Sequence, residues 1–186
     1  MDLQPFPEIA SLSANATTSV IMAIDFNDTT QPAEFVIVTN SKSFPVKVSA
    51  PVGELLQPNT ITEKDFISRK SKTRLLTFHS VHQSYNTTFL DKLGGMNENS
   101  ASVKVSESPE QAIAKAIQLS SNVLQVSASE PNVFYFAGKT AATSVDVLVT
   151  CKIVEEQVKV VVNCEKMVIG SMLLRDIKQF LLNASK

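Results

Sequence analysis

The sequence has few of the residues that an active site requires. Its 186 residues include five glycines and two histidines, and no glycine pattern links a strand to a helix in the way that cradles phosphate. The acidic residues are scattered, and no pair has the spacing that acid–base catalysis needs. A Ser-His-Asp arrangement is not excluded by sequence, but nothing singles one out. We therefore expect a protein that is not an enzyme.

Excess charge and long apolar runs are also absent. Seventeen basic and 18 acidic residues give a net charge of −1, so no basic field favours nucleic acid. No apolar run approaches the roughly 20 residues that span a bilayer. The opening MDLQPFPEIASL lacks the basic and apolar regions of a secretory signal. With only two cysteines, the chain fits a reducing compartment, so we expect a cytoplasmic protein.

Four glycosylation sequons support a different hypothesis. They begin at Asn15, Asn27, Asn86 and Asn183. The alternative function that they indicate is a secreted or luminal β-rich adhesion or binding module. Chance supplies several such triplets in a chain rich in Asn, Ser and Thr, and the missing signal favours the cytoplasmic hypothesis.

The most regular pattern lies in the last third of the chain. Residues 144–154 and 157–164 alternate as two strands separated by two glutamates. A two-residue turn pairs Cys151 with Val160, whereas a longer loop would shift this register. The predicted apolar face contains Val145, Val147, Val149, Cys151, Ile153, Val158, Val160, Val162 and Cys164. The predicted polar face contains Asp146, Thr150, Lys152, Lys159 and Asn163.

A helix is predicted directly after this hairpin. Apolar residues recur at helical spacing at Ile169, Met172, Leu173, Ile177, Phe180 and Leu181. A one-sided hairpin and a one-sided helix bury their apolar faces against each other. The sequence therefore predicts the core of an α+β domain, an antiparallel sheet packed with helices.

The N-terminal part predicts strands at 17–26, 34–39 and 44–49, after a polar lead. Pro45 favours a sheet edge for the third strand. Three strands are too few to close a sandwich, so either other strands complete the module or the three lie against the C-terminal part. Breaks between residues 50 and 60 indicate a linker. We predict an incomplete β-sandwich subdomain at 1–51 and a second subdomain at 52–186.

The middle of the chain predicts a helix that begins near Thr62 and fades by Ser71. A long surface loop is predicted at 69–93. Beyond it we predict a strand at 102–106, a helix at 108–119, and strands at 122–127 and 132–138.

Candidate reactive residues favour structural roles. The histidines, His79 and His82, would lie on opposite faces of a strand without a completing acid or thiol, so solvated loop residues are preferred to a metal site. Cys151 and Cys164 point to the apolar face, which favours buried thiols over a disulfide or a nucleophile.

Two features are candidates for binding. Alternation in the strand 132–138 sends Phe134 and Phe136 to one face and Tyr135 to the other. Either two aromatics pack in the core and one caps a surface strand, or an exposed aromatic anchors a short peptide. The basic run Arg69-Lys70-Lys72-Arg74 is either a solvated loop or a contact for acidic lipid or peptide.

Five stretches together carry a resemblance to a known family. In order, they are MAIDFNDTTQ (22–31), PVGELLQP (51–58), TEKDF (62–66), GMNE (95–98) and EKMVIGSMLLRD (165–176). The chain resembles the C-terminal appendage (ear) of the beta subunit of adaptor protein complex 3, a member of the beta-adaptin family, over roughly residues 6–182.

The resemblance implies a fold and a function. The fold is a β-sandwich followed by an α+β platform. The function is protein transport by a coated-vesicle adaptor, which sorts cargo from Golgi or endosomes to lysosomes and related organelles. The platform would dock accessory or clathrin-type coat proteins, and the other adaptor subunits would bind a preceding part of the protein. The expected location is the cytoplasm, peripherally on Golgi, endosome and vesicle membranes, with no cofactor.

The chain departs from the family pattern in two ways. Related ears use an exposed platform tryptophan, and this sequence has none. The strand that resembles their second aromatic position makes Phe134, Tyr135 and Lys139 the expected partner-binding residues. The connection at 69–93 is about twenty residues longer than the family's, as either a lineage-specific loop or an aberrant insert.

Overall fold

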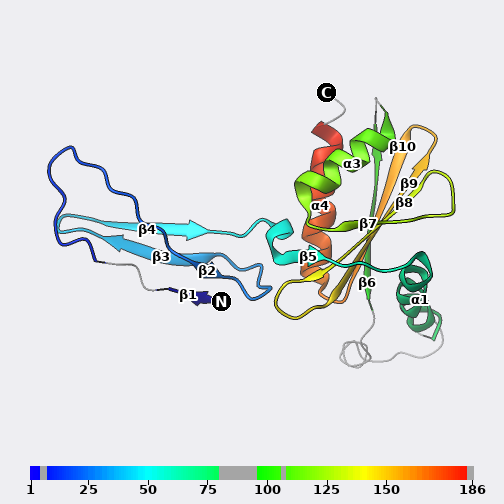
Figure 1. The fold of residues 1–186 in the computed structure, drawn as a ribbon, viewed down its shortest axis with the longest axis horizontal. Coiled ribbons are helices and arrows are strands. Elements are labelled where there is room, and N and C mark those ends of the chain that lie inside the picture. Colours follow the sequence, from blue (N-terminus) through cyan, green and yellow to red (C-terminus); the bar gives the residue numbers. More distant parts are fainter. Residues whose placement is uncertain (5–7, 80–95, 106–107, 184–186) are drawn as a thin grey trace. The chain divides into compact units, whose positions relative to one another are not determined.

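The computed structural model describes residues 1–4, 8–79, 96–105 and 108–183 (Figure 1). They form two compact units, Met1–Ala50 and Pro51–Lys186. No helix in the described ranges is both long and apolar enough to cross a membrane.

The first unit consists of two short antiparallel ribbons. β1 (Asp2–Leu3) pairs with β2 (Ile24–Asp25), and β3 (Ala33–Val38) pairs with β4 (Ser43–Val48). The second ribbon confirms the predicted hairpin. Its loop is closed by Thr39, whose side-chain oxygen accepts the backbone N–H of Lys42 at 3.0 Å. The predicted strand at 17–26 was too long, because β2 has only the two residues of β1 as a partner.

The second unit is built on one antiparallel sheet. Its strand order is β5 (Leu56–Pro58), β8 (Val133–Thr140), β9 (Asp146–Val154), β10 (Gln157–Cys164) and β6 (Asn97–Lys104), and β7 (Leu124–Val126) also pairs with β8. The helices are η1 (Val52–Leu55), α1 (Glu63–His79), α3 (Pro109–Ser120) and α4 (Met167–Asn183) (Figure 1). This arrangement confirms the predicted α+β class.

The β9–β10 register agrees with the prediction. Cys151 pairs with Val160, and Val147 pairs with Cys164. The turn keeps two residues because Glu155 adopts a left-handed conformation at φ 55°. The apolar face of this hairpin packs with residues of α3 and α4 in the main core. The alternation of side chains was therefore enough to fix both the pairing and the buried face.

The opposite face of the sheet is more buried than predicted. Thr150 is 8% exposed, and Leu148 and Asn163 are inaccessible to solvent. α1 lies over this face, where its Phe66 joins a second core cluster with Leu148. Thr150 and Asn163 thus lie on the predicted polar face but are buried there, while Lys152 stays exposed. Lys70 of α1 donates to Thr150, and Asn163 donates to Glu98 of β6.

Two predicted boundaries also require correction. α1 does not fade by Ser71 but continues to His79, because its sequence has neither glycine nor proline to end it. The first part of the predicted loop at 69–93 is therefore helical, and its residues from 80 onward lie outside the described ranges. The predicted linker at 50–60 belongs largely to the second unit, since Val52 is buried and β5 pairs with β8.

Candidate functional site

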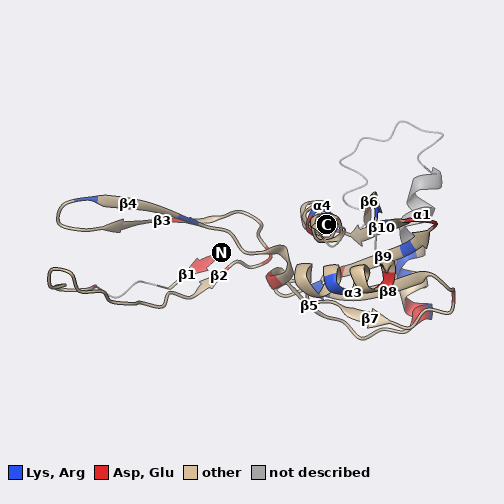
Figure 2. Ribbon diagram, turned by 90° about the horizontal axis from the view of Figure 1, so that it is seen from above, with Lys and Arg blue, Asp and Glu red and all other residues tan. Residues whose placement is uncertain are grey.

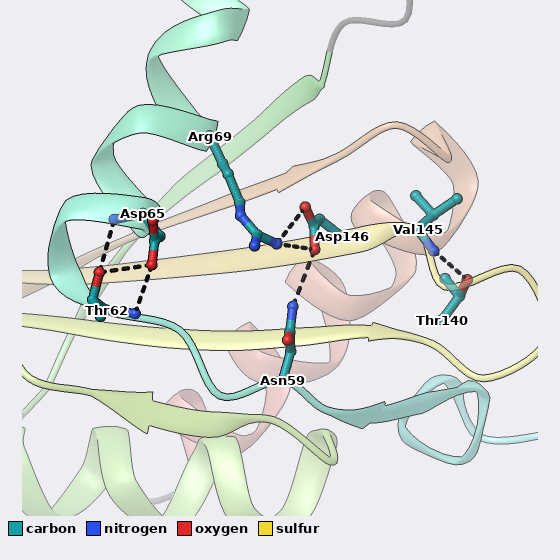
Figure 3. A network of polar contacts seen from close by, with 7 residues as sticks. All are labelled: Asn59, Thr62, Asp65, Arg69, Thr140, Val145 and Asp146. Carbon is teal, nitrogen blue, oxygen red and sulfur yellow. Dashed lines mark hydrogen bonds and ion pairs between the residues drawn. The ribbon is translucent and has the colours of Figure 1, made fainter.

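A reciprocal capping arrangement fixes where α1 begins. The Asp65 N–H donates to Thr62 Oγ1 at 3.2 Å, while the Thr62 N–H and hydroxyl donate to Asp65 Oδ2 at 3.3 and 2.7 Å (Figure 3). These hydrogen bonds from the Thr62 side chain and backbone lower the pKa of Asp65. The cap confirms the predicted helix start at Thr62 and sets the direction in which α1 leaves the sheet.

An aromatic pair holds α1 against strand β8. Phe66 is fully buried, and its ring stacks on Tyr135 with centroids 4.5 Å apart and planes inclined by 28°. Ala137 and Leu148 lie in the same cluster. Stacked pairs of this kind add about 0.5–1.5 kcal/mol to the burial of their area. Tyr135 is only half-buried, so part of this residue remains at the surface.

A polar network anchors the next turn of α1. The Arg69 Nη1 atom lies 2.7 and 2.8 Å from the two carboxylate oxygens of Asp146 on β9 (Figure 3). Asn59 donates to the same carboxylate at 3.1 Å. Lys70 donates to Thr150 Oγ1 at 2.9 Å. Thus α1 is fastened to the sheet by one aromatic stack and by charged side chains one turn further on.

Charges of both signs surround Tyr135. Glu130 is ion-paired with Lys152 at 2.9 Å, and Ser129 donates two hydrogen bonds to Glu63. Burial, followed by the negative charges of Glu130 and Glu63, raises the pKa of Tyr135. Figure 2 shows acidic and basic residues interspersed around α1, β8 and β9. The result is a half-buried aromatic side chain with a charged rim.

The expected partner-binding residues divide between the two faces of β8. Tyr135 and Lys139 lie on the face that α1 covers, where Lys139 is the cross-strand neighbour of Asp146. Phe134 points to the opposite face, beside Cys151, and packs against the main core. Tyr135 and Lys139 therefore share one face of β8, and Phe134 lies on the other.

The first two residues of the basic run lie in a helix and not in a loop. Arg69 and Lys70 belong to α1 and contact the sheet, as described above. Sequence reasoning missed Phe66 and Asp146 as members of this site. The spacing of Phe66 and Arg69, three residues apart on one helix face, was the available signal.

The histidines and cysteines were the candidate reactive residues. His79 ends α1, and His82 lies outside the described ranges. In the described part of the chain, no three His, Cys, Asp or Glu residues form a group that could hold a metal ion. Burial raises the pKa of Cys151 to about 12, and Cys164 is buried as predicted. A neutral, inaccessible thiol is a poor nucleophile.

Comparisons with known proteins point to one family. The model of "AP-3 complex subunit beta-1, C-terminal domain" matches residues 75–181, more than half of the chain. AP-3 complex subunit beta-1 of Homo sapiens is 35% identical over 185 residues, and AP-3 complex subunit beta-2 of Mus musculus is 30% identical over 184 residues. Each alignment covers 97% of this chain but 15% of the longer relative.

The resemblance carried by the five stretches and the family match agree. The antiparallel sheet with helices is the α+β architecture expected of an appendage platform. The chain belongs to the family of the AP-3 complex subunit beta-1 C-terminal domain, an AP-3 beta appendage.

Proposed function

We propose that this chain is a non-enzymatic docking module of a vesicle-coat adaptor. The observation that carries the proposal is the match to AP-3 beta subunits along 97% of the chain. In this proposal the module recruits accessory or clathrin-type coat proteins, and the rest of a longer beta subunit joins it to the other adaptor subunits. It would act in sorting from Golgi or endosomes to lysosomes, on the cytoplasmic face of vesicle membranes.

The docking surface that we propose is the α1-covered face of β8, centred on Tyr135 and Lys139. A half-buried tyrosine offers apolar area at low entropic cost and a hydroxyl for hydrogen bonding. The stack on Phe66 keeps the ring in one orientation, and the Arg69–Asp146 pair keeps α1 in place beside it. A preorganised surface loses less conformational entropy when a partner binds.

A chimera tests the adaptor role. The chain replaces the matched residues of human AP-3 complex subunit beta-1 in cells that lack this subunit, and a truncated subunit without the matched residues is the control. We expect both proteins to assemble with the remaining subunits. Only the chimera should recover accessory proteins and restore the sorting of a lysosomal membrane protein. Equal recovery and equal sorting with the truncated subunit would refute the role.

Point variants of the chimera test the surface. Lys139→Glu reverses one charge four residues along β8 from Tyr135, and Tyr135→Leu removes the ring and the hydroxyl. We expect both to lose the accessory proteins while the circular dichroism of the isolated chain is unchanged. Lys159→Glu is the matched control, since Lys159 is exposed on the same sheet two strands away. If all three variants behave alike, the proposed surface is wrong.

A further inference from the structure

Three lysines lie close together on the sheet face that α1 partly covers. Lys152 on β9 is the direct cross-strand neighbour of Lys159 on β10. Lys70 of α1 donates to Thr150 Oγ1 at 2.9 Å, two residues from Lys152 along β9. Direct cross-strand neighbours have Cβ atoms about 4.5–5.5 Å apart, and diagonal neighbours such as Thr150 and Lys159 lie about 7–8 Å apart. Long, flexible lysine side chains span these distances, so the three ammonium groups can reach one small anion.

The positive charge of this group is only partly neutralised. Like charges directly opposite each other in a sheet repel and lower its stability. The Lys152 ammonium lies 2.9 Å from Glu130 Oε1, in an exposed ion pair of the kind that is weak in water. In the part of the chain that the structure describes, no carboxylate pairs with Lys159. An anion bound between the two lysines would remove their repulsion.

A hydroxyl group borders the lysines. Ser102 of β6 is the cross-strand neighbour of Lys159 on its other side, and both residues are exposed. An ammonium group binds phosphate as a point charge, and a serine hydroxyl donates a hydrogen bond to it. We call these four residues the lysine patch: Lys70, Lys152, Lys159 and Ser102.

The acidic residues that flank the lysine patch on β6 and in the β9–β10 turn have other partners. Glu98 accepts a hydrogen bond from Asn163 at 3.3 Å, and Glu156 pairs with Lys104 at 2.9 Å. Neither carboxylate is paired with Lys159. An anion that approaches the patch therefore meets a positive surface.

We propose that the lysine patch binds a membrane lipid whose headgroup ends in a phosphate monoester. Such a group concentrates a charge of about −1.5 to −2 on one phosphorus, which suits ammonium groups that converge on one point. A phosphodiester headgroup carries less charge at its phosphorus. The basic run at 69–74 contributes to this contact through Lys70, which the fold brings to lysines of two distant strands.

The choice of a membrane lipid over a soluble phosphate rests on the adaptor role proposed above, because an adaptor on a vesicle keeps its surfaces beside lipid headgroups. The lysine patch and the docking surface lie toward different ends of the β8–β9 pair. Lys139 is the neighbour of Asp146, whereas Lys152 is the neighbour of Val133. One chain can therefore contact a lipid and an accessory protein at the same time.

Vesicle flotation tests the surface with the intact chain and no partner protein. One set of phosphatidylcholine vesicles contains phosphatidic acid, whose headgroup is a phosphate monoester. A second set contains phosphatidylserine at the same surface charge, and a third contains phosphatidylcholine alone. Glycerol 3-phosphate and a phosphoserine peptide are the soluble phosphates, and their binding is measured by calorimetry.

We expect the chain to bind the phosphatidic acid vesicles several-fold more tightly than the phosphatidylserine vesicles, and to lose affinity as salt is added. Lys159→Glu removes a positive charge and adds a negative one, so it should weaken this binding about tenfold. Lys115→Glu is the matched control and should bind like the parent. It makes the same charge change at an exposed position of α3, which packs on the opposite face of the sheet.

Three results would each overturn part of the inference. Equal losses for Lys159→Glu and Lys115→Glu would show that net charge drives binding, and the lysine patch would be wrong. Equal binding to both anionic vesicles would remove the preference for a phosphate monoester. Tighter binding of either soluble phosphate than of the vesicles would remove the membrane. No accessory protein takes part, so a failure of the docking role is seen separately, in the chimera.

Discussion

Replacing Phe66 by alanine tests how firmly α1 is held on the sheet. The side chain is fully buried, and truncating a buried phenylalanine lowers the free energy of unfolding by about 3–5 kcal/mol. The stack on Tyr135 supplies about 0.5–1.5 kcal/mol of this range. For a chain of this length, the expected fall in Tm is on the order of 10 °C.

Two companion variants separate the contributions. Phe66→Leu keeps most of the apolar volume but loses the stack, so we expect a loss of about 1–1.5 kcal/mol. Ile67→Ala truncates the next residue of α1, whose side chain is 51% exposed, and should change stability by about 0.5 kcal/mol. The assay is urea unfolding followed by far-ultraviolet circular dichroism, with hydrogen exchange of α1 measured in parallel.

The result also reports how α1 unfolds. If α1 detaches locally before the sheet melts, the loss for Phe66→Ala cannot exceed the free energy that attaches the helix. The exchange data would then show α1 open while β9 stays protected. A loss below about 1 kcal/mol, or one equal to that of Ile67→Ala, would show that Phe66 does not hold α1 and would refute this account of the site.

Three further predictions concern the sheet. A thiol reagent should label Cys151 only after unfolding. Because burial raises the pKa of this thiol from 9.0 to about 12, the thiol ionises at lower pH in the unfolded chain than in the folded one. Its contribution to the free energy of unfolding is therefore complete below pH 9 and is lost as the pH rises toward 12, which unfolding measured at several pH values would show. Gly138→Ala places a Cβ 2.7 Å from Val123 Cγ1, so it should cost about 1–3 kcal/mol in urea unfolding, and Val123→Ala in the same chain should recover part of it. Asp146→Asn removes the partly exposed ion pair with Arg69 and should lower stability by about 1 kcal/mol or less, a difference that shrinks in high salt; insensitivity to salt would contradict the pairing.

The hairpin β9–β10 shows which parts of this fold a sequence can determine. Its apolar side chains recur at alternate positions, and a two-residue turn leaves a register that gathers the predicted apolar set on one face, although Leu148 lies on the other. Local information was sufficient there. The length of α1 was not predictable in the same way, since its apolar periodicity is weak and its attachment depends on a strand that lies far along the chain.

The candidate site shows the same division. The alternation in β8 correctly separated Phe134 from Tyr135, but it did not reveal that Phe66 stacks on the tyrosine. Nor did it reveal that Asp146, assigned to a polar face, holds Arg69 of a helix that was expected to fade nearby. Contacts between distant segments leave no periodic signal in a single sequence.

The strand β6 lies at an edge of the sheet, and its sequence affects how many copies of this protein tolerate close contact. At the opposite edge of the sheet, β5 and β7 pair with successive parts of β8 and so hydrogen-bond most of its outer backbone. Among the described strands, β10 alone pairs with β6. The β6 sequence, NENSASVK, is polar and ends in a lysine that pairs with Glu156. Polar, charged edge strands resist joining the sheets of neighbouring molecules. Many copies held side by side would therefore stay separate proteins.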